Sequence, residues 1–285
     1  MLADTTVKCW GYNAQGQLGN GTNTDSYTAV TVYGITGATA ITAGYFHSCA
    51  LLADATVKCW GYNGNGELGN GTNTDSITAV TVTGITGATA ITAGINHSCA
   101  LLADATVKCW GSNAKGQLGN GTNTDSNTAV TVSGITGATA ITAGYFHSCA
   151  LLADATVKCW GYNGNGGFGY ATTTNSNTAV TVSGITGATA ITAGQYHSCA
   201  LLADTSVKCW GNNSEGQLGN GTNTNSNTAV TVTGISGVTA MAAGGYHSCA
   251  LLADTTIKCW GYNIYGALGN GTTTNSNTPV GVIGL

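Results

Sequence analysis

The sequence contains no arginine and a single proline, and charged residues make up only 6% of its 285 residues. Ordinary soluble domains carry about 25% charged residues. The formal net charge is −4 at pH 7, so the chain offers no basic surface for phosphate groups. This composition argues against nucleic acid as a partner.

Long apolar runs and helical patterns are also absent. No stretch approaches the roughly 18 consecutive apolar residues of a membrane-spanning helix, and no secretory signal precedes the first repeat. No segment combines a 3.6-residue apolar period with helix caps, so we expect almost no helix. The cysteines nevertheless favour an extracellular or cell-surface location, as a mature chain without its leader.

A 50-residue unit recurs instead along the whole chain. Val-Lys-Cys-Trp-Gly begins at Val7, Val57, Val107, Val157 and Val207, and its last copy begins at Ile257. His-Ser-Cys-Ala begins at His47, His97, His147, His197 and His247. A fixed period of this size indicates one supersecondary unit whose copies bury each other's faces. A chemistry repeated in every copy is rarely a single catalytic site.

Each unit reads as four short strands separated by Gly, Asn and Ser turns. In the copy over 36–85, we expect strands at 38–43, 47–52, 56–60 and 79–82, with Asp54 capping the hairpin turn between the second and third. Four strands per ~50 residues is typical of a propeller blade. The chain is therefore predicted to be an all-β, propeller-like array forming a single domain. Its parts are a half-blade, 1–35, and five complete blades, 36–85, 86–135, 136–185, 186–235 and 236–285.

The run His-Ser-Cys-Ala-Leu-Leu-Ala-Asp, followed by Val-Lys-Cys-Trp-Gly-Tyr-Asn and Gly-Gln-Leu-Gly-Asn-Gly-Thr, resembles the repeat of regulator of chromosome condensation proteins in its bacterial, cysteine-bearing form. The resemblance covers the whole chain and implies a β-propeller, usually of seven blades. It also implies a nucleotide-exchange factor for a small GTPase or a chromatin binder, which the low charge disfavours. The chain departs from the family in three places. The hairpin has Ala55 where the family normally has Gly, and among the outer strands only Pro279 keeps the family's proline. At 167–171 the sequence Leu-Gly-Asn-Gly is lost.

The half-blade supplies only the third and fourth strands of a set, and nothing at the other end of the sequence completes it. Either upstream residues belong to it or the array is open. An open array leaves strand edges that pair with another chain. We therefore expect a homo-oligomer or filament.

Ten of the eleven cysteines form pairs ten residues apart, symmetric about the hairpin loop. Such residues lie opposite each other on antiparallel strands, at a separation that suits a disulfide. The predicted pairs are Cys49/Cys59, Cys99/Cys109, Cys149/Cys159, Cys199/Cys209 and Cys249/Cys259. Free buried thiols, or a metal held with His47, are the alternatives; one histidine per pair fits a four-ligand zinc site poorly. Cys9 has no mate and is predicted to be unpaired or intermolecular.

No catalytic residue, metal or cofactor is predicted, because no unique constellation departs from the repeat. Each histidine is expected to bond the backbone of a neighbouring turn. Each tryptophan is expected to pack between blades, with sugar stacking as its alternative. The loop over 70–75 resembles a calcium loop, but Asp75 becomes Asn175, Asn225 and Asn275 in later copies, which leaves too few charges.

Variation between copies marks a candidate binding rim. Its aromatic members are Tyr45, Phe46, Tyr145, Phe146, Tyr196 and Tyr246. Sequons for N-glycosylation occur at Asn20, Asn70, Asn96, Asn120, Asn212, Asn220 and Asn270, although Asn-Gly is also a turn former. The sequence favours a non-catalytic extracellular structural or adhesion scaffold that self-associates. The alternative is a propeller that binds a carbohydrate or protein ligand, in the manner of a lectin.

Overall fold

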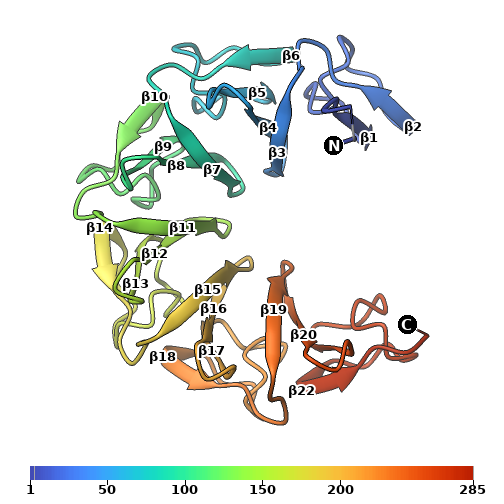
Figure 1. Ribbon diagram of the computed structural model, residues 1–285, viewed down its shortest axis with the longest axis vertical. Helices are drawn as coiled ribbons and strands as arrows, with labels where there is room; N and C mark the ends of the chain where they lie inside the picture. Colours follow the sequence, from blue (N-terminus) through green and yellow to red (C-terminus); the bar gives the residue numbers. More distant parts are fainter. Residues whose placement is uncertain (3, 285) are drawn as a thin grey trace. The chain divides into compact units, whose positions relative to one another are not determined.

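The computed structural model describes residues 1–2 and 4–284, and its regular secondary structure consists of β-strands (Figure 1). Two compact units make up the chain, Met1–Ile141 and Thr142–Leu285. The described residues contain no helix, and hence none that is long and apolar enough to cross a membrane.

The strands repeat in sets of four. The first strands of the sets are β3 (Ala38–Ala43), β7 (Ala88–Ala93), β11 (Ala138–Ala143), β15 (Ala188–Ala193) and β19 (Val238–Ala243). The second strands are β4 (His47–Leu52), β8 (His97–Leu102), β12 (His147–Leu152), β16 (His197–Leu202) and β20 (His247–Leu252). The third strands are β1 (Lys8–Gly11), β5 (Val57–Gly61), β9 (Val107–Gly111), β13 (Val157–Gly161), β17 (Val207–Gly211) and β21 (Ile257–Gly261). The fourth strands are β2 (Ser26–Thr31), β6 (Ser76–Thr81), β10 (Ser126–Thr131), β14 (Ser176–Thr181), β18 (Ser226–Thr231) and β22 (Ser276–Gly281).

Each set is one antiparallel sheet whose strands follow in chain order. The sheets are β3–β6, β7–β10, β11–β14, β15–β18 and β19–β22, here called the first to fifth blades, and a two-stranded sheet β1–β2, here called the half-blade. Five complete blades and one N-terminal half-blade confirm the predicted all-β architecture.

The fourth strand of each blade begins earlier than the sequence suggests. In the first blade it starts at Ser76, where a strand was expected only from Ala79, because Ser76 already pairs with Gly61. The register then shifts between Gly61 and Cys59, which pairs with Val80. A bulge of this kind leaves residues without a regular partner. The alternation of side chains between the two faces of the strand is interrupted there, so the sequence pattern does not show where the strand begins.

The hairpin between the second and third strands turns as predicted at its aspartate. The Asp54 carboxylate accepts hydrogen bonds from the Thr56 amide at 3.0 Å and the Thr56 hydroxyl at 2.6 Å. Ala55 has φ of 62°, a left-handed conformation that a Cβ disfavours and that glycine adopts freely. The departure from Asp-Gly therefore strains the turn without changing its geometry.

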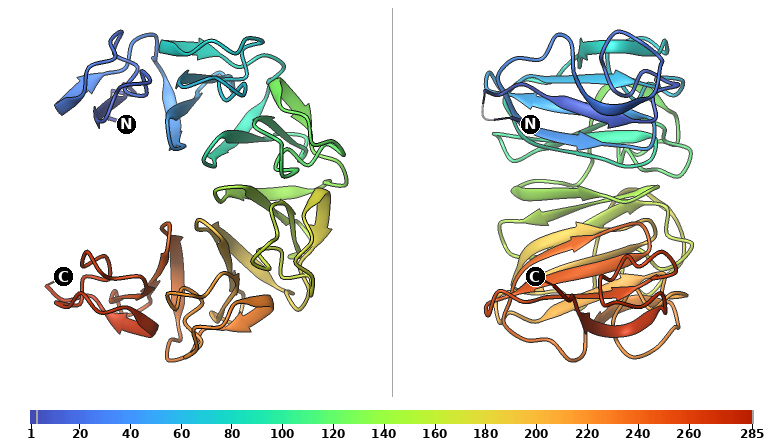
Figure 2. Two further views of the ribbon diagram at one scale, coloured as in Figure 1. Left: turned by 180° about the vertical axis from the view of Figure 1, so that it is seen from behind. Right: turned by 90° about the vertical axis from the view of Figure 1, so that its right-hand side faces the viewer.

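The core lies between consecutive sheets. Val7 and Val32 of the half-blade pack against Ala50, Leu52 and Trp60 of the first blade, and Figure 2 shows these two sheets side by side. The same arrangement joins the first blade to the second, and the fourth to the fifth. The first blade thus presents one face to the half-blade and another to the second blade, which is why a single unit cannot bury its apolar residues alone.

Candidate functional site

Five disulfides join the second and third strands of the five complete blades. They are Cys49–Cys59, Cys99–Cys109, Cys149–Cys159, Cys199–Cys209 and Cys249–Cys259. The two cysteines of each pair lie directly opposite in the register, with Cα atoms 4.0–4.1 Å apart. Cys9 is free and half-buried. Five disulfides indicate an oxidising, non-cytoplasmic environment.

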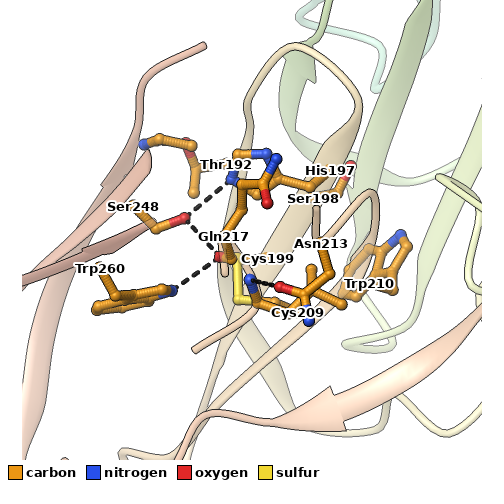
Figure 3. Close-up of a disulfide and its surroundings, with 12 residues drawn as sticks. Thr192, His197, Ser198, Cys199, Cys209, Trp210, Asn213, Gln217, Ser248 and Trp260 are labelled. Carbon is orange, nitrogen blue, oxygen red and sulfur yellow. Dashed lines mark hydrogen bonds between the residues drawn. A yellow bond between two sulfur atoms is a disulfide. The ribbon is translucent and has the colours of Figure 1, made fainter. Parts of the chain in front are cut away.

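In both compact units, a tryptophan next to the second cysteine of a blade connects it to the sheet before it. The Trp60 indole donates a hydrogen bond to the Gln17 carbonyl at 2.9 Å, and the Trp260 indole donates to the Gln217 carbonyl at 2.8 Å. Figure 3 shows the second of these bonds beside the Cys199–Cys209 disulfide. These indoles are fully buried, so their donors need this partner. The blade interface is therefore a packed core, as expected for tryptophan.

The histidines make a different contact from the predicted one. His197 Nε2 lies 2.9 Å from the Ser248 hydroxyl of the next blade (Figure 3), and His147 Nε2 lies 2.8 Å from the Ser198 hydroxyl. For His147 and His197 the expected backbone partner was wrong, because the ring contacts a serine hydroxyl across the blade interface instead of the backbone of a neighbouring turn. Glycine permits the crossing: a Cβ at Gly194 would overlap the His197 ring and the Gly244 carbonyl oxygen.

The hydrogen bonds around this pair fix its protonation. Ser248 donates its hydroxyl proton to the Gln217 carbonyl at 3.2 Å, so its oxygen accepts from an Nε2–H of His197. His197 Nδ1 has no partner among the described residues. Burial, with smaller contributions from His147 and His247, lowers the pKa of His197 to about 3, and burial lowers the pKa of His147 to about 4. The serine hydroxyl is directed at a carbonyl and is not poised as a nucleophile.

A buried asparagine organises each long loop, and sequence reasoning missed it. Asn213 Nδ2 donates to the Thr222 carbonyl at 2.9 Å and the Thr224 carbonyl at 3.1 Å, while its Oδ1 accepts from the Leu218 amide at 2.8 Å. The signal was an asparagine three residues after every tryptophan. The recurrence of this asparagine could have identified it as a structural residue, but the sequons and the calcium-like sequence of the same loops gave the loop asparagines other interpretations.

All the sequons except that of Asn96, which lies between β7 and β8, are in these same loops. Asn220 Oδ1 accepts from the Thr222 hydroxyl at 2.9 Å and the Thr222 amide at 3.1 Å. The amide oxygen is thus engaged in a turn that includes the sequon's own threonine. Glycosylation at these positions stays a prediction.

The ends of the array differ from its interior. Trp10 is 67% exposed, whereas the five equivalent indoles are 0–1% exposed. On the fifth blade, Leu251 is 39% exposed, whereas its four equivalents are 5–6% exposed. Both side chains occupy positions that a neighbouring sheet covers elsewhere in the chain.

Part of the predicted aromatic rim gathers into a cluster. Tyr145, Phe146 and Tyr196 lie together with Tyr162, and their ring centroids are 5.8–6.4 Å apart. Sequence reasoning omitted Tyr162 because it belongs to a different loop. The other predicted members lie in two further aromatic groups. One group is Tyr12, Tyr45 and Phe46, and the other is Tyr246, Tyr262 and Tyr265.

Consecutive four-stranded antiparallel sheets with buried interfaces define a β-propeller chain. The family model for the RCC1-like domain matches residues 3–284, so the chain belongs to the RCC1-like domain family.

Solved structures share the fold. Human WBSCR16 is similar with a TM-score of 0.85 and 22% identity, over 99% of this chain and 77% of that chain. Prp20p of Saccharomyces cerevisiae is similar with a TM-score of 0.66 and 17% identity, over 100% of this chain and 87% of that one. The ectodomain of the Physcomitrella patens receptor kinase CR4 has a TM-score of 0.55 and 27% identity, over 81% of this chain and 55% of that one. No curated protein matches the sequence significantly.

Proposed function

We propose that the chain is a non-catalytic, protein-binding scaffold that works in an extracellular or cell-surface environment and self-associates head to tail. The observation that carries the proposal is the pair of exposed positions at the two ends of the array. Trp10 and Leu251 are each exposed several-fold more than their equivalents at the interior interfaces. Their equivalents at the interior interfaces, such as Leu51 and Trp110, are buried in one cluster between two sheets, which supports a contact of the same kind between the two ends.

The interior blade interfaces supply the template for the contact. Between the fourth and fifth blades, the Trp260 indole donates to the Gln217 carbonyl and the Lys258 ammonium donates to the Gly234 carbonyl at 3.1 Å. In a head-to-tail contact, Trp10 and Lys8 of one copy take the places of Trp260 and Lys258 as donors. The acceptors are the carbonyls of Ala267 and Gly284 of the other copy, which lie 50 residues after Gln217 and Gly234. Such an interface is heterologous, so it gives a filament unless the rotation closes a ring.

The comparisons support a binding role in general terms. One structure in this family holds yeast RCC1 (Prp20) bound to Kap60, and another concerns the binding of Prp20p to Gsp1p and histones. The CR4 similarity is to a receptor ectodomain. Together with the five disulfides, that similarity favours the extracellular setting.

Light scattering over a range of protein concentrations tests the self-association. We expect the mass of the wild-type chain to rise with concentration, and Trp10→Asp or Leu251→Asp to remain monomeric. Thr131→Asp introduces the same charge at an exposed position of an outer strand and serves as the matched control, which should behave as wild type. A wild-type chain that stays monomeric at every concentration contradicts the proposal.

The second candidate function is carbohydrate binding at the aromatic cluster. The four rings of Tyr145, Phe146, Tyr162 and Tyr196 are only partly buried, and tyrosine combines an apolar ring with a polar hydroxyl. Several equivalent weak sites would gain strength through multivalency. A glycan array tests it: binding that Tyr196→Ala removes supports this function, and an array without signal above background rejects it.

A further inference from the structure

The long loop of the third blade begins with the same sequence as that of the first blade. Both contain Gly-Tyr-Asn-Gly-Asn-Gly, at 61–66 and at 161–166. The next residue is Glu67 in the first blade and Gly167 in the third. The third blade thus keeps the preceding sequence of this glutamate and lacks the glutamate itself.

In the first blade, the Glu67 carboxylate is fully buried and is held by a single residue. Its Oε2 accepts a hydrogen bond from the Asn65 backbone amide at 2.9 Å, and its Oε1 accepts from Asn65 Nδ2 at 2.8 Å. Two donors of one residue therefore bind the two oxygens of one carboxylate. Hydrogen bonds to an ionised acceptor are stronger than neutral ones, and they offset part of the cost of burying the charge.

An asparagine two positions earlier accompanies the glutamate and not the glutamines. Where the equivalent of Glu67 is a glutamine, its side-chain oxygen accepts from the backbone amide of the residue two positions earlier, at 2.8–3.0 Å; these residues are Gln15, Lys115 and Glu215. Asn65 adds a side-chain donor, which suits a carboxylate because a carboxylate has two acceptor oxygens and a carboxamide has one. The third blade has Asn165 at this position, as the first blade has Asn65.

In the third blade, both donors of Asn165 are without the acceptor that Glu67 supplies to Asn65. Asn165 forms no hydrogen bond with any described residue. Apart from its chain neighbours, a Cβ at Gly167 would have within 4 Å only the carbonyl oxygens of Tyr162 and Tyr196, at 3.8 and 3.9 Å. The space beside Gly167 is therefore open, and two donors that suit a carboxylate lie two residues away.

The residues that flank this space belong to the aromatic cluster. The ring centroids of Tyr162 and Tyr196 are 5.8 Å apart, and that of Phe146 is 6.3–6.4 Å from both. These rings are partly buried and Gly167 is buried, so a ligand group enters as the rings turn about their side-chain torsions. A slender side chain passes between rings more readily than a sugar ring does. Tyrosine is also enriched where proteins bind each other, so the geometry favours a protein ligand.

We propose that the third blade binds a partner protein through a glutamate side chain of that partner, whose carboxylate occupies the place that Glu67 fills in the first blade. Its two oxygens accept from the backbone amide and Nδ2 of Asn165, and its methylene groups pack against the rings of Tyr162 and Tyr196. The inference rests on the protein-binding function proposed above and names the chemistry of the partner. The site lies in the interior of the array and is separate from its two end faces.

Selection from a displayed library of random peptides tests the site. Wild type captures the peptides, and Gly167→Glu serves as the counter-selection, because it restores the residue of the first blade and fills the space. Peptides that bind wild type and not Gly167→Glu should share a glutamate at one fixed position. Changing that glutamate to glutamine in a synthetic peptide should weaken binding at least about tenfold, as expected for a hydrogen bond to a charged group.

A second variant tests the donors without filling the space. Asn165→Asp replaces Nδ2 by an oxygen that repels a carboxylate, so the selected peptides should no longer bind. Asn175→Asp is the matched control: it adds the same charge to the same loop, at a position where Asp75 and Asp125 occur in other loops, and it should bind the peptides as wild type does.

Three outcomes overturn the proposal. No peptide distinguishes wild type from Gly167→Glu, or the peptides that do so lack a shared glutamate, or acidic sugars on a glycan array distinguish the two proteins while peptides do not.

Light scattering separates this result from head-to-tail assembly. Gly167→Glu leaves both end faces unchanged, so it should self-associate as wild type does. A failed selection with a chain that assembles rejects the glutamate site alone. Glutamate-dependent capture by a chain that stays monomeric supports the site and rejects only the assembly.

Discussion

Lowering the pH from about 7.5 to about 5 should destabilise the chain through its buried histidines. Burial lowers the pKa of His47 and of His147 to about 4, and that of His197 to about 3. Their unfolded value is about 6.5. Because the folded state binds fewer protons, the stabilisation is complete above pH 6.5 and is lost as the pH falls towards the folded values.

The size of the effect follows from the shifts. At about pH 5, each of the three histidines is protonated only in the unfolded state, which costs about 2 kcal/mol per residue and about 6 kcal/mol in total. Glu67 acts in the opposite direction, since burial raises its pKa. Hydrogen bonds from Thr56 lower the pKa of the hairpin aspartate Asp54, and Ser206 does the same for Asp204, so the contribution of these aspartates is lost only at more acidic pH.

Urea unfolding at the two pH values measures this loss, and His197→Gln identifies its source. A glutamine amide can still donate to Ser248, but it does not titrate. We expect the pH-dependent part of the unfolding free energy to fall by about 2 kcal/mol in this variant. If His197→Gln shows the full wild-type pH dependence, the buried histidines are not the cause and the reasoning fails.

Further predictions concern the repeat itself, and all are measured by equilibrium unfolding. Replacing Cys199 and Cys209 together by alanine should lower the free energy of unfolding by about 3 kcal/mol, because the unfolded chain regains loop entropy. Cys9→Ser breaks no disulfide and should change this free energy little. Equal effects of the two changes would contradict the prediction. Asn213→Ala should cost about 2–4 kcal/mol, because the Leu218 amide and two threonine carbonyls lose their partners; a loss below about 0.5 kcal/mol would argue against the network. Ala155→Gly should stabilise the chain by about 1 kcal/mol, since Ala155 has φ of 61°; destabilisation would refute the strain at this turn.

The repeat made the fold predictable. A hairpin with cysteines symmetric about Asp54 has one register, so the pairing of Cys49 with Cys59 followed from spacing alone. The order of strands followed from turn residues at fixed intervals. Only the outer strands were placed too late, because the register shift between Cys59 and Gly61 breaks their period.

The contacts between blades were not predictable from one repeat. His47 meets Ser98, which lies 51 residues away in the sequence, and no local pattern specifies a partner across an interface. The exposure of Trp10 also escaped prediction, because its sequence context is the same as that of the buried Trp60. What differs is the presence of a preceding sheet, which is a property of the array and not of the repeat.

Mixing two assembly-deficient variants tests the central claim most directly. Trp10→Asp keeps a native Leu251 face, and Leu251→Asp keeps a native Trp10 face, so each variant alone should be monomeric. In an equimolar mixture, native mass spectrometry should find a heterodimer and nothing larger, since only one productive interface can form. A mixture that remains monomeric, or single variants that still assemble, would contradict head-to-tail association through these two faces.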